Sequence, residues 1–383
     1  MSSKVLLATR LYPPEVGAAA FRLQALTRGL TDAGADVSVL TTRPPRGTDD
    51  PRPAKGVKRW PVLRDSGGNV RGYVQYMSFD LPLFFRLLAA RADIVVSEPP
   101  PTTGLMVALS SWLRRRRYVY YAADIWTDAL AATSAPAPVV SIMRSIEGVA
   151  LRKALKVIAI SQGVADQTRQ FSVDPSRVVV VGNGVDTETF SPDGPAAEPG
   201  YRYFVYTGTM SEWQGAEIFI DAMEEVLLRF PDVRLHFFGQ GSAEAALKEK
   251  AARMADDRIR FGGVVPPAEA ATWIRGAAGS LVSIVPDQGY DFAKPTKIYA
   301  AAACGTPVIY AGKGASAGMV AEGGLGYASG FSSTEVAKAM IRLLEEPDHG
   351  RAARAAWVED NASLRTSGRH AAAEVLRAIE EGR

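Results

Sequence analysis

Cysteine and histidine are scarce in this chain of 383 residues. Cys304 is its one cysteine, so no intramolecular disulfide and no thiolate metal cluster can form, which fits a reducing compartment. The three histidines, His236, His349 and His370, are far apart in the sequence. Because zinc sites depend on His and Cys ligands, a zinc enzyme is not expected.

Long apolar runs and an excess of one charge sign are also missing. The chain has 44 basic and 41 acidic residues, a net charge of +3, which is too balanced for a dedicated nucleic-acid binder. No window holds 18 uninterrupted apolar residues, so no transmembrane helix is expected. The N-terminal run is interrupted by Arg10 and a proline pair, which disfavours a secretory signal. We therefore expect a cytoplasmic protein.

The common nucleotide and hydrolase motifs are absent as well. No G-x-G-x-x-G follows the first predicted strand, and no G-x-x-x-x-G-K-[ST] occurs, which argues against an NAD enzyme and a P-loop NTPase. No G-x-S-x-G occurs either, so a serine hydrolase is not expected.

What the chain does contain is short apolar runs that alternate with stretches of helical spacing, a pattern typical of parallel sheets covered by helices. Strands are predicted at 4–9, 36–41, 57–62, 93–97, 118–122, 156–161 and 177–181, and then at 203–207, 234–238, 258–261, 280–285 and 307–310. A helix is predicted at 18–33, and helical spacing over 70–90 is broken at Pro82.

Residues 182–200 separate the two series of strands. They are rich in Gly, Pro and Asp and are interpreted as a linker. We predict an α/β protein of two doubly wound Rossmann-like domains facing a cleft, an N-terminal domain at 1–190 and a C-terminal domain at 191–383. The last helices, from about residue 351, could pack on either domain.

Three loops at predicted carboxyl ends of strands are candidate ligand sites, because open α/β sheets bind ligands there. Residues 12–20 hold Gly17 before a helix start, and residues 204–215 repeat this arrangement with Gly208. In residues 291–307, Pro295 stands in the first turn of a helix that Lys294 and Lys297 bracket. Each loop has a plainer interpretation: an ordinary turn, a small-residue helix start, or solvated lysines.

These segments resemble a known family. The order YPPEVGAAAFRL, AISQGVADQ, VVVGNGVDTETFSP, FVYTGTMSEWQG, FGQGSAEAALKEKA, RFGGVVPP and KPTKIYAAAACGTP is similar to that of the retaining, nucleotide-sugar-dependent glycosyltransferases of the GT-B fold, family 4. Within the family the chain looks closest to the branch that transfers amino or deoxy sugars in O-antigen and capsule assembly.

The resemblance implies a nucleoside diphosphate sugar, linked to UDP or dTDP, held mainly by the C-terminal domain. Gly17 faces the diphosphate from the N-terminal domain, and the loop 262–267, with Val264, holds the base. No metal and no cofactor are implied. The residues implied for the donor phosphates are Gly208, Thr209, Gln214, Lys294, Thr296 and Lys297.

The chain departs from the family at three positions. Ala123 stands where many members carry a histidine that contacts the sugar. Phe292 and Ala300 stand where many members carry a pair of glutamates. The residues that bind the sugar and the ribose therefore stay unassigned. Two carboxylates that follow predicted strands, Asp124 and Glu98, are candidate catalytic groups. The alternatives are a helix cap for Asp124 and a solvated loop acid for Glu98.

The acceptor side is marked only by composition. Residues 112–117, WLRRRR, and 79–86, FDLPLFFR, could touch an anionic membrane, or the arginines could simply favour a helix C-terminus. Peripheral contact with the inner face of a membrane is therefore one expectation. Two other functions stay open: a degenerate sugar-nucleotide-binding paralogue, or a sugar-nucleotide epimerase of the same architecture.

Overall fold

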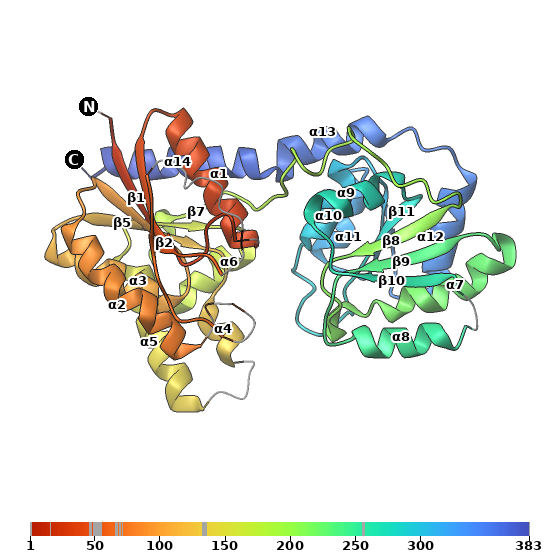
Figure 1. Ribbon diagram of the computed structural model, residues 1–383, viewed down its shortest axis with the longest axis horizontal. Helices are drawn as coiled ribbons and strands as arrows, with labels where there is room; N and C mark the ends of the chain where they lie inside the picture. Colours follow the sequence, from red (N-terminus) through yellow and green to blue (C-terminus); the bar gives the residue numbers. More distant parts are fainter. Residues whose placement is uncertain are drawn as a thin grey trace. The chain divides into compact units, whose positions relative to one another are not determined.

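The computed structural model shows a chain of parallel β/α units (Figure 1). It describes residues 2–15, 17–45, 48, 56–65, 68, 70, 72–131, 136–254 and 257–382. The chain forms two compact units, the first comprising Met1–Asn183 and Leu364–Arg383 and the second Gly184–Ser363. The division falls inside the segment interpreted as a linker, and each unit is built around a sheet of its own.

The first unit holds a parallel sheet that has seven strands within the described residues, in the order β3-β2-β1-β4-β5-β6-β7. The strands are β1 (Lys4–Ala8), β2 (Asp36–Thr42), β3 (Val57–Trp60), β4 (Ile94–Ser97), β5 (Arg117–Ala122), β6 (Lys156–Ala159) and β7 (Val178–Val180). The helices are α1 (Ala18–Asp32), α2 (Tyr73–Ala89), α3 (Pro101–Leu113), α4 (Trp126–Ala131), α5 (Ala137–Lys153), α6 (Gln162–Thr168) and α14 (Leu364–Glu380).

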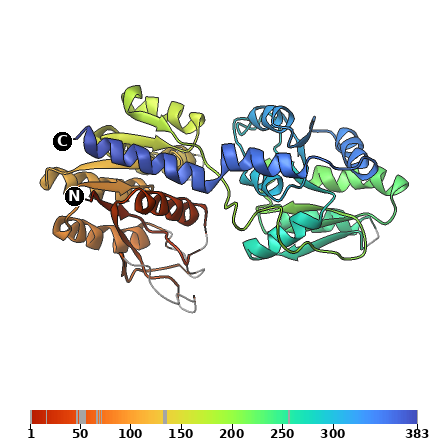
Figure 2. The ribbon, with the colours of Figure 1, turned by 90° about the horizontal axis from the view of Figure 1, so that it is seen from above.

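Both faces of this sheet are buried, because strand side chains alternate between them. Leu6 and Ala8 of β1 pack in a core with α2, α3 and α5. Val5 and Leu7 point the other way, into a core with α1 and α14. Figures 1 and 2 show α14, the blue C-terminal helix, lying beside α1.

The second unit repeats this design with six parallel strands among the residues described, in the order β10-β9-β8-β11-β12-β13. The strands are β8 (Tyr203–Thr207), β9 (Arg234–Phe238), β10 (Ile259–Gly263), β11 (Gly279–Ser283), β12 (Val308–Ala311) and β13 (Gly326–Ser329). The helices are α7 (Glu217–Arg229), α8 (Glu244–Ala252), α9 (Pro267–Gly276), α10 (Thr296–Ala303), α11 (Ala315–Glu322), α12 (Ser333–Glu345) and α13 (Arg351–Ala362).

The predicted α/β class with two doubly wound sheets is confirmed. Three details of the prediction were wrong. Helix α2 continues through Pro82, since Phe79, Leu83 and Leu87 on either side of the proline are all buried in one core. Strand β13 was missed because its sequence, GYAS, is short and only partly buried. Pro295 is the residue before α10 rather than part of its first turn.

Each sheet has a switch point where the strand order reverses, between β1 and β4 in the first unit and between β8 and β11 in the second. In such sheets the crevice outside the carboxyl ends of the strands at the switch point is the usual place for a ligand. The loops that follow these four strands therefore position the candidate site residues.

Candidate active site

The loop after β8 and the start of α10 come together in the second unit. Gly208 has a φ of 104°, a left-handed conformation that favours glycine. The carbonyl oxygen of Thr209 accepts hydrogen bonds from the Tyr206 hydroxyl at 2.8 Å and from Lys297 Nζ at 3.3 Å. Two loops that the sequence singled out separately, about ninety residues apart, thus meet at one point.

Lys297 is a buried cation at this point. Its side chain is only 9% exposed, and Nζ lies 3.8 Å from the centre of the Tyr206 ring. Burial lowers the pKa of its ammonium group to about 7. Among the described residues no carboxylate forms a salt bridge with it. An anionic ligand would supply the missing negative charge.

The N-terminus of α10 adds a second attraction for an anion. No side chain caps it, and the positive end of a helix dipole favours negative charge. Thr296, the first helical residue, is exposed, and so is Lys294 just before the helix. These two side chains lie on the surface near Lys297 in sequence, whereas Lys297 itself is enclosed.

Gln214 is held inside its own loop. It ends the short 3-10 helix η3 (Glu212–Gln214), where it forms a capping box with Ser211. Its Oε1 accepts hydrogen bonds from the Ser211 backbone N–H at 3.1 Å and from the Tyr206 hydroxyl at 3.2 Å. The carbonyl end of Gln214 therefore shapes the loop, and its predicted contact with donor phosphates stays a prediction.

Two further predicted contacts lie at strand and helix ends. Val264 directly follows β10 and is 66% exposed, so it is available for an apolar contact. In the first unit Gly17 precedes α1, and a Cβ placed on it would meet no atom within 4 Å. The space around Gly17 suits the approach of a ligand to the α1 N-terminus.

Glu98, which directly follows β4, is buried rather than solvated. Because β1 and β4 are neighbours, Thr9 Oγ1 reaches its carboxylate at 2.7 Å. Arg22 of α1 forms a salt bridge with it at 3.1 Å, and both side chains are 5% exposed. Burial raises the pKa of Glu98, and the charge of Arg22 opposes this. The expectation of a solvated loop acid was wrong.

Asp124, two residues after β5, is exposed to solvent. The protein packed around its carboxyl nevertheless raises the pKa of this group, and the positive charge of Arg22 opposes that rise. The start of α4 is capped by Glu147 of α5, which accepts the backbone N–H groups of Trp126 at 2.8 Å and Thr127 at 2.9 Å. Glu147 therefore satisfies these helix-start donors, and the catalytic role of Asp124 stays a prediction.

Sequence reasoning missed Arg10, two residues after β1. Its guanidinium lies 3.7 Å from the centre of the Tyr76 ring, and the residue is 9% exposed. Its Nη1 has no hydrogen-bond partner within the part of the chain that the structure describes. Its position in the sequence could have indicated it, because Arg10 is a basic residue at the carboxyl end of β1, which is one of the two strands at the switch point.

Comparisons with known proteins agree with this architecture. Residues 17–184 match the glycosyl transferase 4-like domain, and residues 201–346 match the glycosyl transferases group 1 family. A D-inositol 3-phosphate glycosyltransferase of Frankia alni is 29% identical over 236 residues, which is 55% of this chain. The chain spans 57% of that relative's length.

Solved structures share the fold over nearly the whole chain. Anabaena HepE, solved with UDP-glucose, gives a TM-score of 0.68 at 18% identity, covering 98% of this chain and 99% of that one. A putative UDP-N-acetylglucosamine 2-epimerase of Listeria monocytogenes gives 0.62 at 15% identity, covering 100% and 97%. None of the helices in the described residues is both long and apolar enough to cross a membrane. The chain is thus similar to glycosyltransferases in both halves, with a glycosyl transferase 4-like match followed by a group 1 match, and it has the two Rossmann-like domains of the GT-B fold.

Proposed function

We propose that this protein transfers a sugar from a nucleoside diphosphate sugar to an acceptor hydroxyl, with retention of configuration and without a metal. The observation that carries the proposal is Lys297, a buried cation at the uncapped N-terminus of α10 beside the β8 loop. Charge develops on the diphosphate as it leaves the sugar, and a fixed cation and helix N–H groups stabilise that charge. The UDP-glucose bound by the structural neighbour HepE supports this class of donor.

The donor nucleotide is proposed to be UDP- or dTDP-linked, with little discrimination at the ribose. Ala300 is buried in α10 and has no polar atom that could bond a ribose hydroxyl. A site that makes no such bond does not reject an analogue lacking the hydroxyl. This would suit the amino- or deoxysugar branch that the sequence resembles.

Asp124 is the proposed catalytic residue. It is exposed at the carboxyl end of β5 and has a raised pKa, so it can exchange a proton with an acceptor hydroxyl. Glu98, committed to Arg22 and Thr9, is proposed to hold the loop after β1 in place.

The acceptor is proposed to carry an anionic group. The curated relative acts on an inositol phosphate by its name. In the first domain, Arg10 offers a buried guanidinium whose Nη1 has no hydrogen-bond partner among the described residues. Action at the inner face of a membrane is part of the proposal.

Calorimetry with UDP tests the donor site. Lys297→Met removes the charge, and Lys338→Met, at an exposed position of α12 outside the predicted donor site, is the matched control. A charge-assisted contact contributes roughly 1.5–3 kcal/mol, so Lys297→Met should weaken UDP binding by about tenfold or more. If both variants bind like the natural protein, or if both lose affinity equally, the donor site is not at Lys297.

The reaction class is tested separately with sugar nucleotides. Slow release of the nucleoside diphosphate supports a transferase. Interconversion of free sugar nucleotides would identify an epimerase, a class that shares this fold in the Listeria structure. Binding without either reaction would identify a degenerate paralogue. This outcome is worth testing because Ala123, Phe292 and Ala300 stand where many family members carry a histidine and two glutamates.

A further inference from the structure

Helix α2 carries apolar side chains on two opposite faces. Phe79, Leu83 and Leu87, spaced four residues apart, are buried in the first domain's core. A second stripe with nearly the same spacing faces solvent and is between 37% and 66% exposed. It consists of Tyr73, Val74, Met77, Leu81 and Phe85. One apolar stripe suffices to pack a helix on a sheet, so the second stripe is available to contact a partner or a surface outside the domain.

Helix α3 extends this exposed apolar surface. Thr103 Oγ1 donates to Asp80 Oδ1 at 2.6 Å, and Arg116 donates to the carbonyl of Leu87 at 3.2 Å. The two helices are therefore side by side and parallel, and their C-terminal ends lie together. Figure 1 shows α2 and α3 next to each other. On α3 the exposed apolar residues are Leu109, Trp112 and Leu113, with Trp112 76% exposed.

The same end of the surface is strongly basic. Arg114, Arg115 and Arg117 follow α3 and are exposed. Helix α3 contains no acidic residue, and the one acid of α2, Asp80, is buried. A cation at a helix C-terminus is favoured by the dipole, but the dipole acts within the last turn and does not account for the exposed apolar stripes.

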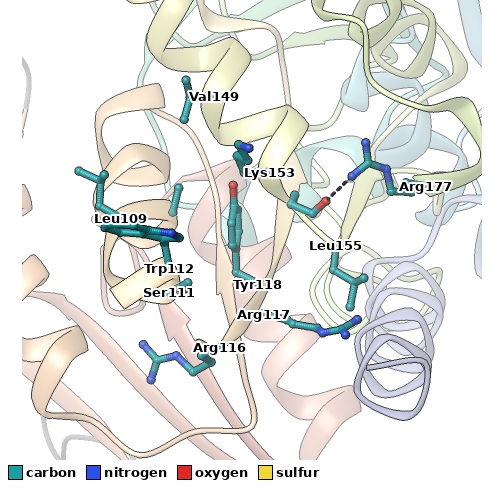
Figure 3. A pocket seen from close by; sticks show the side chains of 12 residues that line it. Leu109, Ser111, Trp112, Arg116, Arg117, Tyr118, Val149, Lys153, Leu155 and Arg177 are labelled. Atoms are coloured by element: carbon teal, nitrogen blue, oxygen red, sulfur yellow. Dashed lines mark hydrogen bonds between the residues drawn. The ribbon is translucent and has the colours of Figure 1, made fainter. Parts of the chain in front are cut away.

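A cavity of about 570 Å³ lies where the apolar and basic parts meet. Figure 3 shows Leu109 and Trp112 on one side of it, with Arg116 just before β5, Arg117 at the start of β5 and Lys153 at the end of α5 around it. The floor is Tyr118 of β5, whose hydroxyl donates to the Ala150 carbonyl at 2.6 Å and is thus already used. A phosphate group at the mouth of this cavity would meet several cations.

We infer that the exposed face of α2 and α3, with the basic cavity at its end, binds the surface of an anionic phospholipid bilayer. Tryptophan beside arginine is favoured at a membrane interface, where the ring sits at headgroup level and the cations meet lipid phosphates. A second copy docked through the same face would bring arginine against arginine. The charge pattern therefore favours an anionic lipid surface over self-association. The inference rests on the membrane contact of the proposed function and does not depend on the donor site.

Vesicle co-sedimentation tests this with the whole chain of 383 residues. The probes are vesicles of phosphatidylcholine alone and of phosphatidylcholine mixed with phosphatidylglycerol, at low and high salt. We expect binding to the mixed vesicles only, weakened by salt. Arg114→Glu with Arg115→Glu should lower the partition coefficient by more than about tenfold, since each basic residue near such a surface adds roughly a 5-fold gain. Trp112→Ser with Phe85→Ser should lower it as well.

Matched controls lie on the second domain. Leu228→Ser removes an apolar side chain that is 88% exposed on α7, and Arg253→Glu reverses an arginine that is 74% exposed. Both should bind vesicles like the natural protein, and all variants should keep its UDP affinity and melting temperature. Equal binding to neutral vesicles, or unchanged binding by both double variants, would overturn the inference. So would concentration-dependent dimerisation that the Trp112 and Phe85 variants abolish, because the face would then belong to a second copy.

Discussion

Lys297 lies in an environment that opposes the charge a lysine normally carries. Its pKa is about 7 in the folded protein against 10.5 for an unperturbed lysine. Between these values the unfolded chain binds more protons than the folded one, so stability rises with pH over this window. The second domain should therefore unfold at a higher temperature as pH rises from about 7 towards 10. Melting curves of the natural protein and Lys297→Met check this, and the variant should lack that part of the rise.

The same pKa has a consequence for ligand binding. A diphosphate stabilises the charged form of Lys297, so binding at pH 8 should take up close to one proton from the buffer, about 0.9 in the limit. Calorimetry in two buffers of different ionisation enthalpy measures this number. Proton uptake that persists in Lys297→Met would assign the proton to another group.

The two carboxylates of the first domain are expected to respond differently to removal of their charge. Asp124→Asn should lower turnover by roughly 10²-fold or more at unchanged UDP affinity, because its carboxyl is exposed and available for proton transfer. Glu98→Gln leaves Arg22 buried without its partner, so it should lower the free energy of unfolding by about 3–5 kcal/mol. Steady-state kinetics and denaturant unfolding of both variants separate the roles. Full turnover in a folded Asp124→Asn would remove Asp124 from the mechanism.

At the scale of elements, α1 and α14 cross at unusually small residues. A Cβ at Gly368 would lie 2.6 Å from the backbone carbonyl of Ala25, and one at Gly29 would lie 2.9 Å from the oxygen of Gly368. Gly368→Ala should therefore force the helices apart and destabilise the first domain by about 1–3 kcal/mol. Gly318→Ala in α11 is the control, because its nearest neighbour is 3.7 Å away. That control should be neutral or stabilising by up to about 1 kcal/mol in denaturant unfolding.

At the scale of the whole molecule, the C-terminal segment Leu364–Arg383 returns to the first domain and completes it. Ala371, Val375 and Ala378 of α14 are buried against the first sheet, and Lys156 of β6 forms a buried salt bridge with Glu374 at 3.1 Å. A chain truncated after Ser363 should lose the cooperative unfolding of the first domain and keep that of the second. Calorimetry with domain-resolved proteolysis follows both transitions. An intact first transition would show that α14 is dispensable.

Much of this architecture can be predicted from local sequence patterns. Short, largely apolar runs such as KVLLA and YFVYT form strands because both faces of a parallel sheet are buried, and the predicted bounds of β8 and β9 match the structure. The motif around Lys297 could be located in the same way, since Pro before a helix start and flanking lysines are local signals. These features depend on neighbours within a few residues, which is why the sequence alone determined them.

Other features depend on contacts between distant segments, and only the tertiary structure decided them. The burial of Lys297 against Tyr206, the ion pair of Glu98 with Arg22, and the capping of α4 by Glu147 each join residues 20 to 91 positions apart. The passage of α2 through Pro82 likewise depends on a core built from other elements. Periodicity gives the type of an element, but the charge state and solvent exposure of a side chain are set by whichever segments the fold packs around it.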